Sequence, residues 1–289
     1  MPPTLGQSEE IAMSAPNVLL ASKGHPFQRE PFFQMFDAFQ QEGEISAWTH
    51  VEQPAAQLFF QPENSRDYDC IVDYSMPGVF GVGGPPDPPE ALKDGYMRLT
   101  EEGKGLVMIH HNICSWPGWE EYAEIIGGRF FYNPGSLRGV DYPDSGYLLA
   151  ANHTCEVVAE EADHPVVQGV DLSFELQDEI YLAPYHEDSL VPLVRSDFDF
   201  TYKNFFSPSL VVNDGRMYER GDWTHPPTPN LVVWAKNYRN SPIVYVQAGD
   251  VPTSYNNSNY RRLLANAIKW VASDEAHEWA RARNAAAVS

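Results

Sequence analysis

The sequence predicts an α/β fold built on parallel strands, and two observations support that prediction. In the first half of the chain, short apolar runs alternate with segments whose apolar residues recur at helical spacing. Glycines and prolines typical of turns separate these segments. Strands that alternate with helices form βαβ units with parallel strands. A length of 289 residues suits one large domain of this class with a substantial core.

The expected elements of the first half follow one another from Asn17. The run 17–22 is an apolar strand, and the helix expected at 30–41 carries phenylalanines at helical spacing. Strands are expected next at 44–51 and 68–74, followed by a Gly/Pro-rich loop at 81–89. A helix at 89–102 then leads into a buried strand at 105–110, and a helix at 119–126 stops at Gly127-Gly128.

The second half of the chain has a less regular pattern. Short strands are expected at 155–158, 190–194, 231–234 and 243–246, with a turn at 237–241 between the last two, and an amphipathic helix at 259–272. No linker divides the chain. We therefore expect a disordered leader (1–16), a single α/β domain with an irregular insertion in its second half (17–273) and a helical tail (274–289).

Composition excludes several classes of partner. Forty acidic residues against 19 basic ones give a net charge of −21, which argues against a nucleic-acid partner or an anionic membrane. Apolar runs fall far short of the ~18 residues of a membrane span. The leader has no secretory signal pattern, and three cysteines without metal-type spacing fit a reducing compartment. We expect a cytoplasmic, bacterial-type protein that can form a homo-oligomer.

Polar side chains follow the buried strand at the point where it ends. His110, His111 and Asn112 come directly after the apolar run 105–109, and His25 follows the first strand. In open α/β sheets, ligands bind beyond the carboxyl ends of the strands. Imidazole transfers protons near neutral pH and binds metals. We therefore interpret the histidines as a candidate site, with surplus structural histidines as the alternative.

Glu179 is the best candidate for a carboxylate in this site. It lies beside Ile180 in a segment suited to a strand or a buried loop, where it can act as a general base, an imidazole partner or a metal ligand. A solvated loop acid is the alternative. The sequence has no standard metal-binding, dinucleotide or phosphate-loop motif. No cofactor is therefore firmly expected, although His110, Glu179 and another histidine can together bind a divalent metal ion.

Several other residues in expected loops have chemistry suited to binding or catalysis. Cys114 can be a nucleophile, but a buried structural cysteine is the favoured interpretation. Aromatic loop residues, Trp116 and Tyr181 among them, can stack on sugar rings while Asn, Asp and His side chains bind hydroxyl groups. The alternative is that these aromatic side chains belong to the core.

A series of motifs resembles the ThuA-like (trehalose-utilisation) family of the class I glutamine amidotransferase-like superfamily. The resemblance extends over about 17–273. Its motifs are Gly24-His25-Pro26, Gly103-Lys104-Gly105 before His110, Asp163-His164-Pro165-Val166, Asp178-Glu179 before Tyr181, and Asn266-Ala267-Ile268 in the closing helix.

The resemblance implies a flavodoxin-like three-layer sandwich with a central, mostly parallel sheet. It also places His110 at the elbow where true amidotransferases have their catalytic cysteine, so it implies no glutaminase activity. Many relatives have Gly-His after the last strand, where this chain has Gly249-Asp250. That departure leaves Asp250 as a possible substitute acid.

The resemblance further implies an enzyme of carbohydrate metabolism, a sugar isomerase, lyase or hydrolase that acts on a 3-keto-glycoside or a related small-molecule sugar. A ketone acidifies the neighbouring C–H bond, so a positioned imidazole or carboxylate can remove that proton. In this hypothesis His110 is the general base, Glu179 is its partner or the acid, and His25 and His111 contact an oxyanion or hydroxyl groups. The expected substrate-binding residues are Asn112, Trp116, Tyr181, His186, His225 and Asp250.

Two other functions remain open on the sequence. One is a non-catalytic sugar-binding or regulatory protein on the same scaffold. The other is a metal-dependent hydrolase with His110 and Glu179 as metal ligands.

Overall fold

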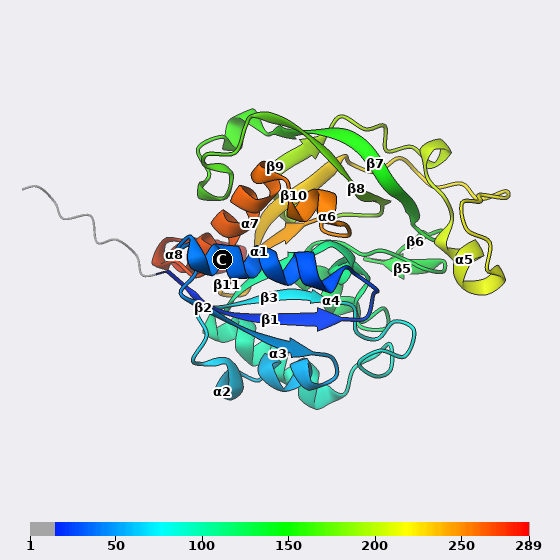
Figure 1. The fold of residues 1–289 in the computed structure, drawn as a ribbon. Helices are drawn as coiled ribbons and strands as arrows, with labels where there is room; N and C mark the ends of the chain where they lie inside the picture. Colours follow the sequence, from blue (N-terminus) through cyan, green and yellow to red (C-terminus); the bar gives the residue numbers. More distant parts are fainter. Residues whose placement is uncertain (1–14, 289) are drawn as a thin grey trace, which may run out of the picture.

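The computed structural model describes residues 15–288, and a nine-stranded mixed sheet forms its centre (Figure 1). Residues 1–14 of the expected leader lie outside the described residues. In spatial order, the sheet contains β2 (Ala47–Glu52), β1 (Asn17–Lys23), β3 (Cys70–Ser75), β4 (Gly105–Ile109), β11 (Ser241–Val246), β10 (Leu231–Tyr238), β9 (Val191–Ser196), β7 (Gly146–Val157) and β8 (Ser173–Leu182). A separate small ribbon pairs β5 (Gly135–Leu137) with β6 (Val140–Tyr142).

Helices connect and cover these strands. The α-helices are α1 (Arg29–Gln41), α2 (Pro62–Ser65), α3 (Glu90–Glu102), α4 (Glu120–Ile126), α5 (Pro208–Asp214), α6 (Pro252–Tyr255), α7 (Ser258–Val271) and α8 (Asp274–Val288). Short 3₁₀ helices lie at η1 (Ala55–Phe60), η2 (His110–Cys114), η3 (Ala159–Glu161), η4 (Pro165–Val167), η5 (Glu187–Ser189) and η6 (Tyr202–Asn204). Within the described part of the chain, no helix is long and apolar enough to cross a membrane.

The half of the sheet from β2 to β11 is parallel. β1 pairs with β2 and β3, and β4 pairs with β3 and β11, all in parallel register. The strands and helices that the sequence predicted for this half begin and end within three residues of the expected ranges, because apolar runs and glycine stops specify them locally, whereas the short helices η1 and α2 were not expected. The α/β prediction with a parallel central sheet is confirmed.

Helices lie on both faces of the sheet and make it a three-layer sandwich, as expected. Alternate residues of each strand point to opposite faces. Val18 and Leu20 of β1 belong to the core under α1 and α7, whereas Leu19 belongs to the core on the opposite face, with α3 and α4. The inner parallel strands β1, β3, β4 and β11 are thus buried on both sides, which is why they read as apolar runs, whereas the edge strand β2 is only partly buried.

The other half of the sheet is antiparallel and differs most from the sequence prediction. β10 and β11 form the expected hairpin, but β7 begins at Gly146, where a strand was expected only from residue 155. An irregular pairing register between Leu148 and Ala151 interrupts the alternation that would have indicated a long strand. β8 is a full strand, where the sequence suggested a strand or a buried loop.

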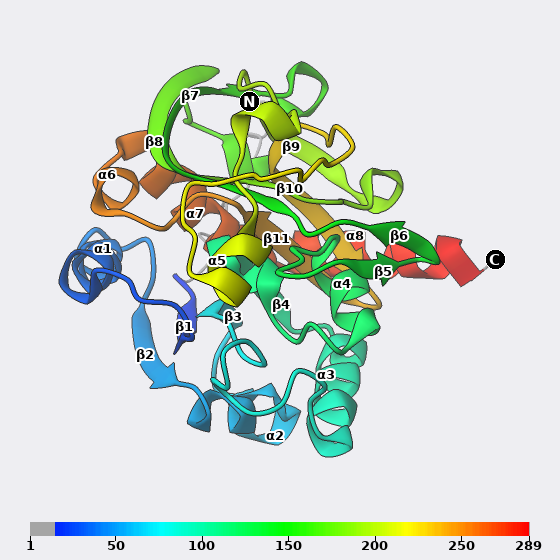
Figure 2. The same cartoon turned by 90° about the vertical axis from the view of Figure 1, so that its right-hand side faces the viewer.

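This irregularity in β7 is a β-bulge opposite Glu179. Leu148 pairs with Ile180 and Ala151 with Asp178, so two residues of β7 face the single residue Glu179. A bulge bends its strand and changes the direction of nearby side chains. In Figure 2, β7 and β8 curve over the rest of the sheet. The curved edge strand β8 returns to the end of β11, where the backbone N–H of Tyr181 donates to the side chain of Gln247 at 3.1 Å.

Candidate functional site

His110 lies at the carboxyl end of β4 and forms a tight elbow. It is fully buried and has a φ of 52°, in the left-handed region that few residues other than glycine adopt. The Tyr245 hydroxyl donates to the His110 carbonyl at 2.8 Å. Because Val246 of β11 pairs with Ile109, the next residue, Gln247, lies beside His110. Its carbonyl oxygen is 2.7 Å from Nδ1 of His110.

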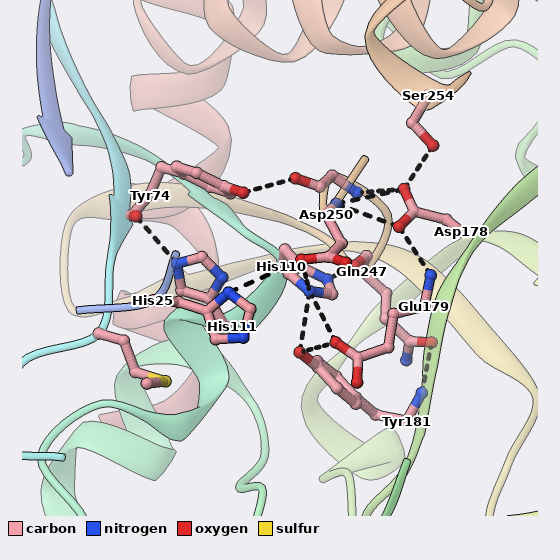
Figure 3. A network of polar contacts seen from close by, with 12 residues as sticks. His25, Tyr74, His110, His111, Asp178, Glu179, Tyr181, Gln247, Asp250 and Ser254 are labelled. Atoms are coloured by element: carbon pink, nitrogen blue, oxygen red, sulfur yellow. Dashed lines mark hydrogen bonds and ion pairs between the residues drawn. The ribbon is translucent and has the colours of Figure 1, made fainter. Parts of the chain in front are cut away.

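The other ring nitrogen of His110 faces a carboxylate and a phenol (Figure 3). Nε2 lies 3.1 Å from Oε2 of Glu179 and 2.9 Å from the Tyr181 hydroxyl, which itself donates to Glu179 at 2.8 Å. A carbonyl oxygen only accepts, so Nδ1 carries a hydrogen and Nε2 is the nitrogen that gains or loses a proton. We call His110, Glu179 and Tyr181 the triad.

The triad stabilises a charged imidazole. Burial alone would lower the pKa of His110, but the hydrogen bond to Glu179 and the negative charges of Asp250, Glu179 and Asp178 outweigh it and raise the pKa to about 9. His110 is therefore an imidazolium at neutral pH, with a proton on Nε2.

This shift makes the protein's stability depend on pH. A histidine pKa raised from 6.5 to about 9 stabilises the fold fully below pH 6.5, and the effect is lost as the pH rises through 9. At about 1.4 kcal/mol per pH unit, the loss is about 3 kcal/mol. We expect the free energy of unfolding of wild type, relative to His110→Gln, to decline by that amount between pH 6.5 and 9.5 in urea titrations. A constant difference would contradict the charged state of His110.

Asp178 holds the loop after β11 against the triad. Its buried carboxylate accepts hydrogen bonds from the backbone N–H groups of Gly249 (2.7 Å), Asp250 (3.1 Å) and Glu179 (2.7 Å), and from the hydroxyl of Ser254. Burial raises the pKa of Asp178 to about 6, against the opposing effects of His110 and these hydrogen bonds. Above that pH the carboxylate is charged and fixes both Glu179 and the Gly249-Asp250 turn.

Gly249 allows the loop to approach the elbow closely. It has a φ of 139°, and a Cβ atom there would lie 2.7 Å from Cγ2 of Ile109 and 2.9 Å from the Tyr260 hydroxyl. We expect Gly249→Ala to lower the free energy of unfolding by about 3 kcal/mol, because backbone strain and overpacking add. The control, Gly43→Ala, also has positive φ but nothing within 4 Å of its Cβ, and should cost about 1 kcal/mol. Equal losses in denaturant titrations would contradict the steric argument.

His25 and His111 lie on the opposite side of His110 from Glu179 (Figure 3). Their ring centroids are 4.8 Å apart. His111 is fully buried with Nε2 3.1 Å from the Tyr74 carbonyl, and burial, with the charges of His110 and His25, lowers its pKa well below the usual value. Nδ1 of His25 lies 3.7 Å from Oδ1 of Asp250 and forms no hydrogen bond within the described residues.

The triad opens into a pocket of about 510 Å³ beyond the carboxyl ends of the parallel strands. Figure 2 looks onto this side of the sheet, with α5 in front of it. Four polar lining side chains lie at the triad or beside it: Glu179, Tyr181, Asp250 (3.7 Å from Nε2 of His110) and His25 (3.7 Å from Asp250). His110 is not among the lining residues. Glu179 and Tyr181 therefore reach a ligand, and His110 supports them from behind.

Other residues expected at the site lie away from the pocket. Asn112 bonds to the Ser75 carbonyl and to Tyr122, and Trp116 is buried against Gly78. His186 lies 3.6 Å from Glu124, and His225 bonds to the carbonyl of Pro226. Cys114 is buried, and burial together with the charge of Glu179 raises the pKa of its thiol far above the usual value, as a structural cysteine requires.

Two residues that organise the site were not selected from the sequence. Asp178 directly precedes Glu179 in the sequence. Only the hydrogen bonds that its carboxylate accepts from four donors in the structure distinguish it from a carboxylate in a solvent-exposed loop. Gln247 binds His110 through its carbonyl and Tyr181 through its side chain. The polar residue that ends the apolar run 241–246 was an available signal, because β11 lies beside β4 in the sheet.

The site also has the donor set of a cation site. One ligand atom each from His110, Glu179 and Asp250 lies within 4.8 Å of the others. Imidazole nitrogen and carboxylate oxygen suit several divalent transition metals. Such an ion would replace the proton on Nε2 of His110.

The fold is that of a flavodoxin-like α/β protein, and its candidate site lies at the carboxyl edge of the sheet. The chain belongs to the ThuA family (trehalose utilisation), whose profile matches residues 17–271. No curated protein matches the sequence.

Solved structures share the fold at low sequence identity. A ThuA-like protein from Bacteroides uniformis aligns at 15% identity and a TM-score of 0.63, over 93% of this chain and 96% of its own. One from Parabacteroides merdae aligns at 17% identity and 0.61, over 90% of both chains. A cytoplasmic protein of Salmonella typhimurium aligns at 13% identity and 0.55, over 88% of this chain and 99% of its own.

Proposed function

We propose that this protein is an enzyme of carbohydrate metabolism that performs acid–base chemistry on a glycoside oxidised to a ketone at C3. The observation that carries the proposal is the triad, with its charged imidazole, carboxylate and phenol in mutual contact at the end of a pocket. The trehalose-utilisation description of the family supports a sugar substrate. A cytoplasmic location is part of the proposal, in keeping with the net charge and with the Salmonella protein.

In the first step, Glu179 removes the proton from C2 of the sugar. The C3 ketone acidifies that C–H bond, and the electron pair moves into the C2–C3 bond and onto the ketone oxygen as an enolate. In this mechanism His25, which lines the pocket, donates a hydrogen bond to this oxygen. The nearby imidazolium of His110 stabilises the new negative charge.

In the second step, the enolate expels the glycosidic oxygen. The C1–O bond breaks, a C1–C2 double bond forms and the ketone returns. The departing oxygen takes a proton from the Tyr181 hydroxyl. Nε2 of His110 then gives its proton to the Tyr181 oxygen. Burial raises the pKa of Tyr181 well above its usual value, so this hydroxyl donates rather than ionises. Return of the C2 proton from Glu179 to His110 through Tyr181 restores the triad.

These roles reverse part of the hypothesis drawn from the sequence. That hypothesis made His110 the general base, whereas an imidazole with a pKa of about 9 holds its proton at neutral pH. Glu179 and Tyr181 also stand between His110 and the pocket. We therefore assign the base to Glu179 and treat His110 as the charged proton reservoir behind it.

Proton NMR in deuterated buffer tests the proposal. With 3-keto-glucosides, wild type should incorporate deuterium at C2 and release the glycosidic substituent, whereas the parent glucosides should remain unchanged. The variant His110→Ala should be at least about 100-fold slower. Tight binding without exchange or release would replace the proposal by the alternative of a non-catalytic sugar-binding or regulatory protein.

A metal-dependent hydrolase is the second candidate, because His110, Glu179 and Asp250 converge. In that case His110, Glu179 and Asp250 would hold a divalent ion, which would supply Lewis-acid activation of a substrate oxygen or of water. The test is metal analysis of untagged protein, with titration of Zn²⁺ and Mn²⁺ followed by thermal unfolding. One equivalent of metal that Asp250→Asn loses would support this candidate, and an unchanged unfolding temperature at millimolar metal would exclude it.

A further inference from the structure

We infer that the pocket selects glycosides whose substituent is apolar and aromatic, rather than a second sugar. The inference rests on the proposed function and names its substrate class. It comes from the half of the pocket that lies away from the triad, whose lining differs sharply in chemistry from the triad end.

A row of aromatic rings leads from the triad to the surface. Tyr181 stacks on His110 with ring centroids 4.9 Å apart, and Phe130 lies 4.7 Å from Tyr181. Tyr132 follows at 5.2 Å from Phe130, and Phe80 at 5.1 Å from Tyr132. All four residues, from Tyr181 to Phe80, line the pocket. A flat ring that enters the pocket would meet aromatic surface along this whole wall.

Another part of the lining is aliphatic. Helix α5 contributes Pro208, Val211 and Val212, and the loop after it contributes Met217. The phenols in this half already have protein partners. The Tyr132 hydroxyl contacts Sδ of Met76, and the Tyr147 hydroxyl accepts from the backbone N–H of Tyr218. None of the described residues that α5, the loop after it and the aromatic row beyond Tyr181 contribute to the lining has a charged or amide side chain.

Two large apolar side chains that line the pocket are exposed to solvent. Phe80 is 63% exposed and Met217 is 48% exposed, and both line the pocket. Large apolar side chains that are exposed in one concave place mark a surface that a ligand covers. The ring of Phe80 stands at the outer end of the aromatic row, so an aromatic substituent that extends from the triad reaches it.

A disaccharide fits this arrangement poorly. Its second hexose carries several hydroxyl groups, and each of them loses water on entry and needs a new hydrogen-bond partner. The apolar half offers few such partners, chiefly the hydroxyls of Tyr132 and Tyr147, whereas an aromatic group loses nothing by leaving water. The split between a polar end and an apolar half therefore matches one sugar ring followed by an apolar group.

Isothermal titration calorimetry of the full chain with naphthyl glucoside, methyl glucoside, trehalose and 1-naphthol tests this inference. We expect naphthyl glucoside to bind at least about tenfold more tightly than methyl glucoside or trehalose. Phe80→Asn should reduce that ratio by about tenfold, and Asn tolerates the left-handed φ of 51° at this position. Leu58→Asn, 62% exposed and outside the pocket lining, is the matched control and should keep the ratio.

The other outcomes separate the two proposals. Trehalose or methyl glucoside that binds as tightly as naphthyl glucoside would overturn the inference and leave the proposed function standing. A preference for naphthyl glucoside that is unchanged in both Phe80→Asn and Met217→Ser would likewise overturn the inference and leave the proposed function standing. Naphthol that binds as tightly as its glucoside would show that the triad end does not recognise sugar, and would overturn both proposals. When the glycosides of this panel are oxidised at C3, the naphthyl compound should also have the highest kcat/KM.

Discussion

Glu179→Gln should lower kcat for a 3-keto-glucoside by about 10²–10⁴, the usual contribution of a positioned general base. The amide cannot accept the C2 proton, yet it keeps the size and shape of the carboxylate. The substrate affinity of the Glu179→Gln variant should therefore differ little from that of wild type. NMR of reactions quenched at successive times, over a range of substrate concentrations, measures C2 deuteration and product release and gives kcat and KM. The expected pattern is a loss in kcat with a small change in KM.

The same strand offers a matched control. Glu175 lies four residues before Glu179 on β8, and its side chain is exposed. Glu175→Gln removes the same charge from the same strand and should keep wild-type kcat. Tyr181→Phe should retain C2 exchange but slow the release of the substituent, because only the proton donor is lost. Full activity in Glu179→Gln would refute the assignment of the base.

Asp178→Ala should produce the largest loss of stability, about 3–5 kcal/mol in the free energy of unfolding. The substitution leaves the buried N–H groups of Gly249, Asp250 and Glu179 without their acceptor. Each buried, unsatisfied donor costs about 1–3 kcal/mol. Urea unfolding at pH 7.5, where the Asp178 carboxylate is charged, gives the value.

Two further variants separate charge from hydrogen bonding. Asp178→Asn keeps one acceptor oxygen and should lose about half as much stability as Asp178→Ala. Glu175→Ala, at an exposed position on the same strand, should lie within about 0.5 kcal/mol of wild type. A loss of less than 1 kcal/mol in Asp178→Ala would mean that the loop after β11 does not depend on this carboxylate.

The parallel half of the fold could be predicted because its signals are local. An apolar strand such as β4, with glycines before it and polar residues after it, is specified by a few consecutive residues. The same logic placed His110 and His25 at the carboxyl edge of the sheet, since parallel strands end together. Glu179 was selected for its place beside Ile180 in a segment suited to a strand or a buried loop, and Tyr181 as a loop aromatic in a family motif, without any indication of how β8 reaches the elbow.

The rest of the site depends on features that leave little trace in a single sequence. The bulge opposite Glu179 is a matter of register between two strands, and the curl of β7 and β8 follows from it. The role of Asp178 depends on backbone N–H groups about 70 residues away, which no side-chain pattern reveals. His186 and His225 share their residue type and loop setting with His25, so the sequence could not separate them.

The bulge in β7 has a further consequence for how the triad can be observed. His110 belongs to the parallel half of the sheet, and Glu179 to the antiparallel edge strand that the bulge bends back toward it. The curvature of one half thus sets the proton affinity of a residue in the other. Flattening of β7 and β8 would separate the pair and let the pKa of His110 fall, since the charge of Asp250 alone would then oppose the effect of burial. An NMR titration that measures the pKa of the His110 ring would therefore report any change in the curvature of β7 and β8.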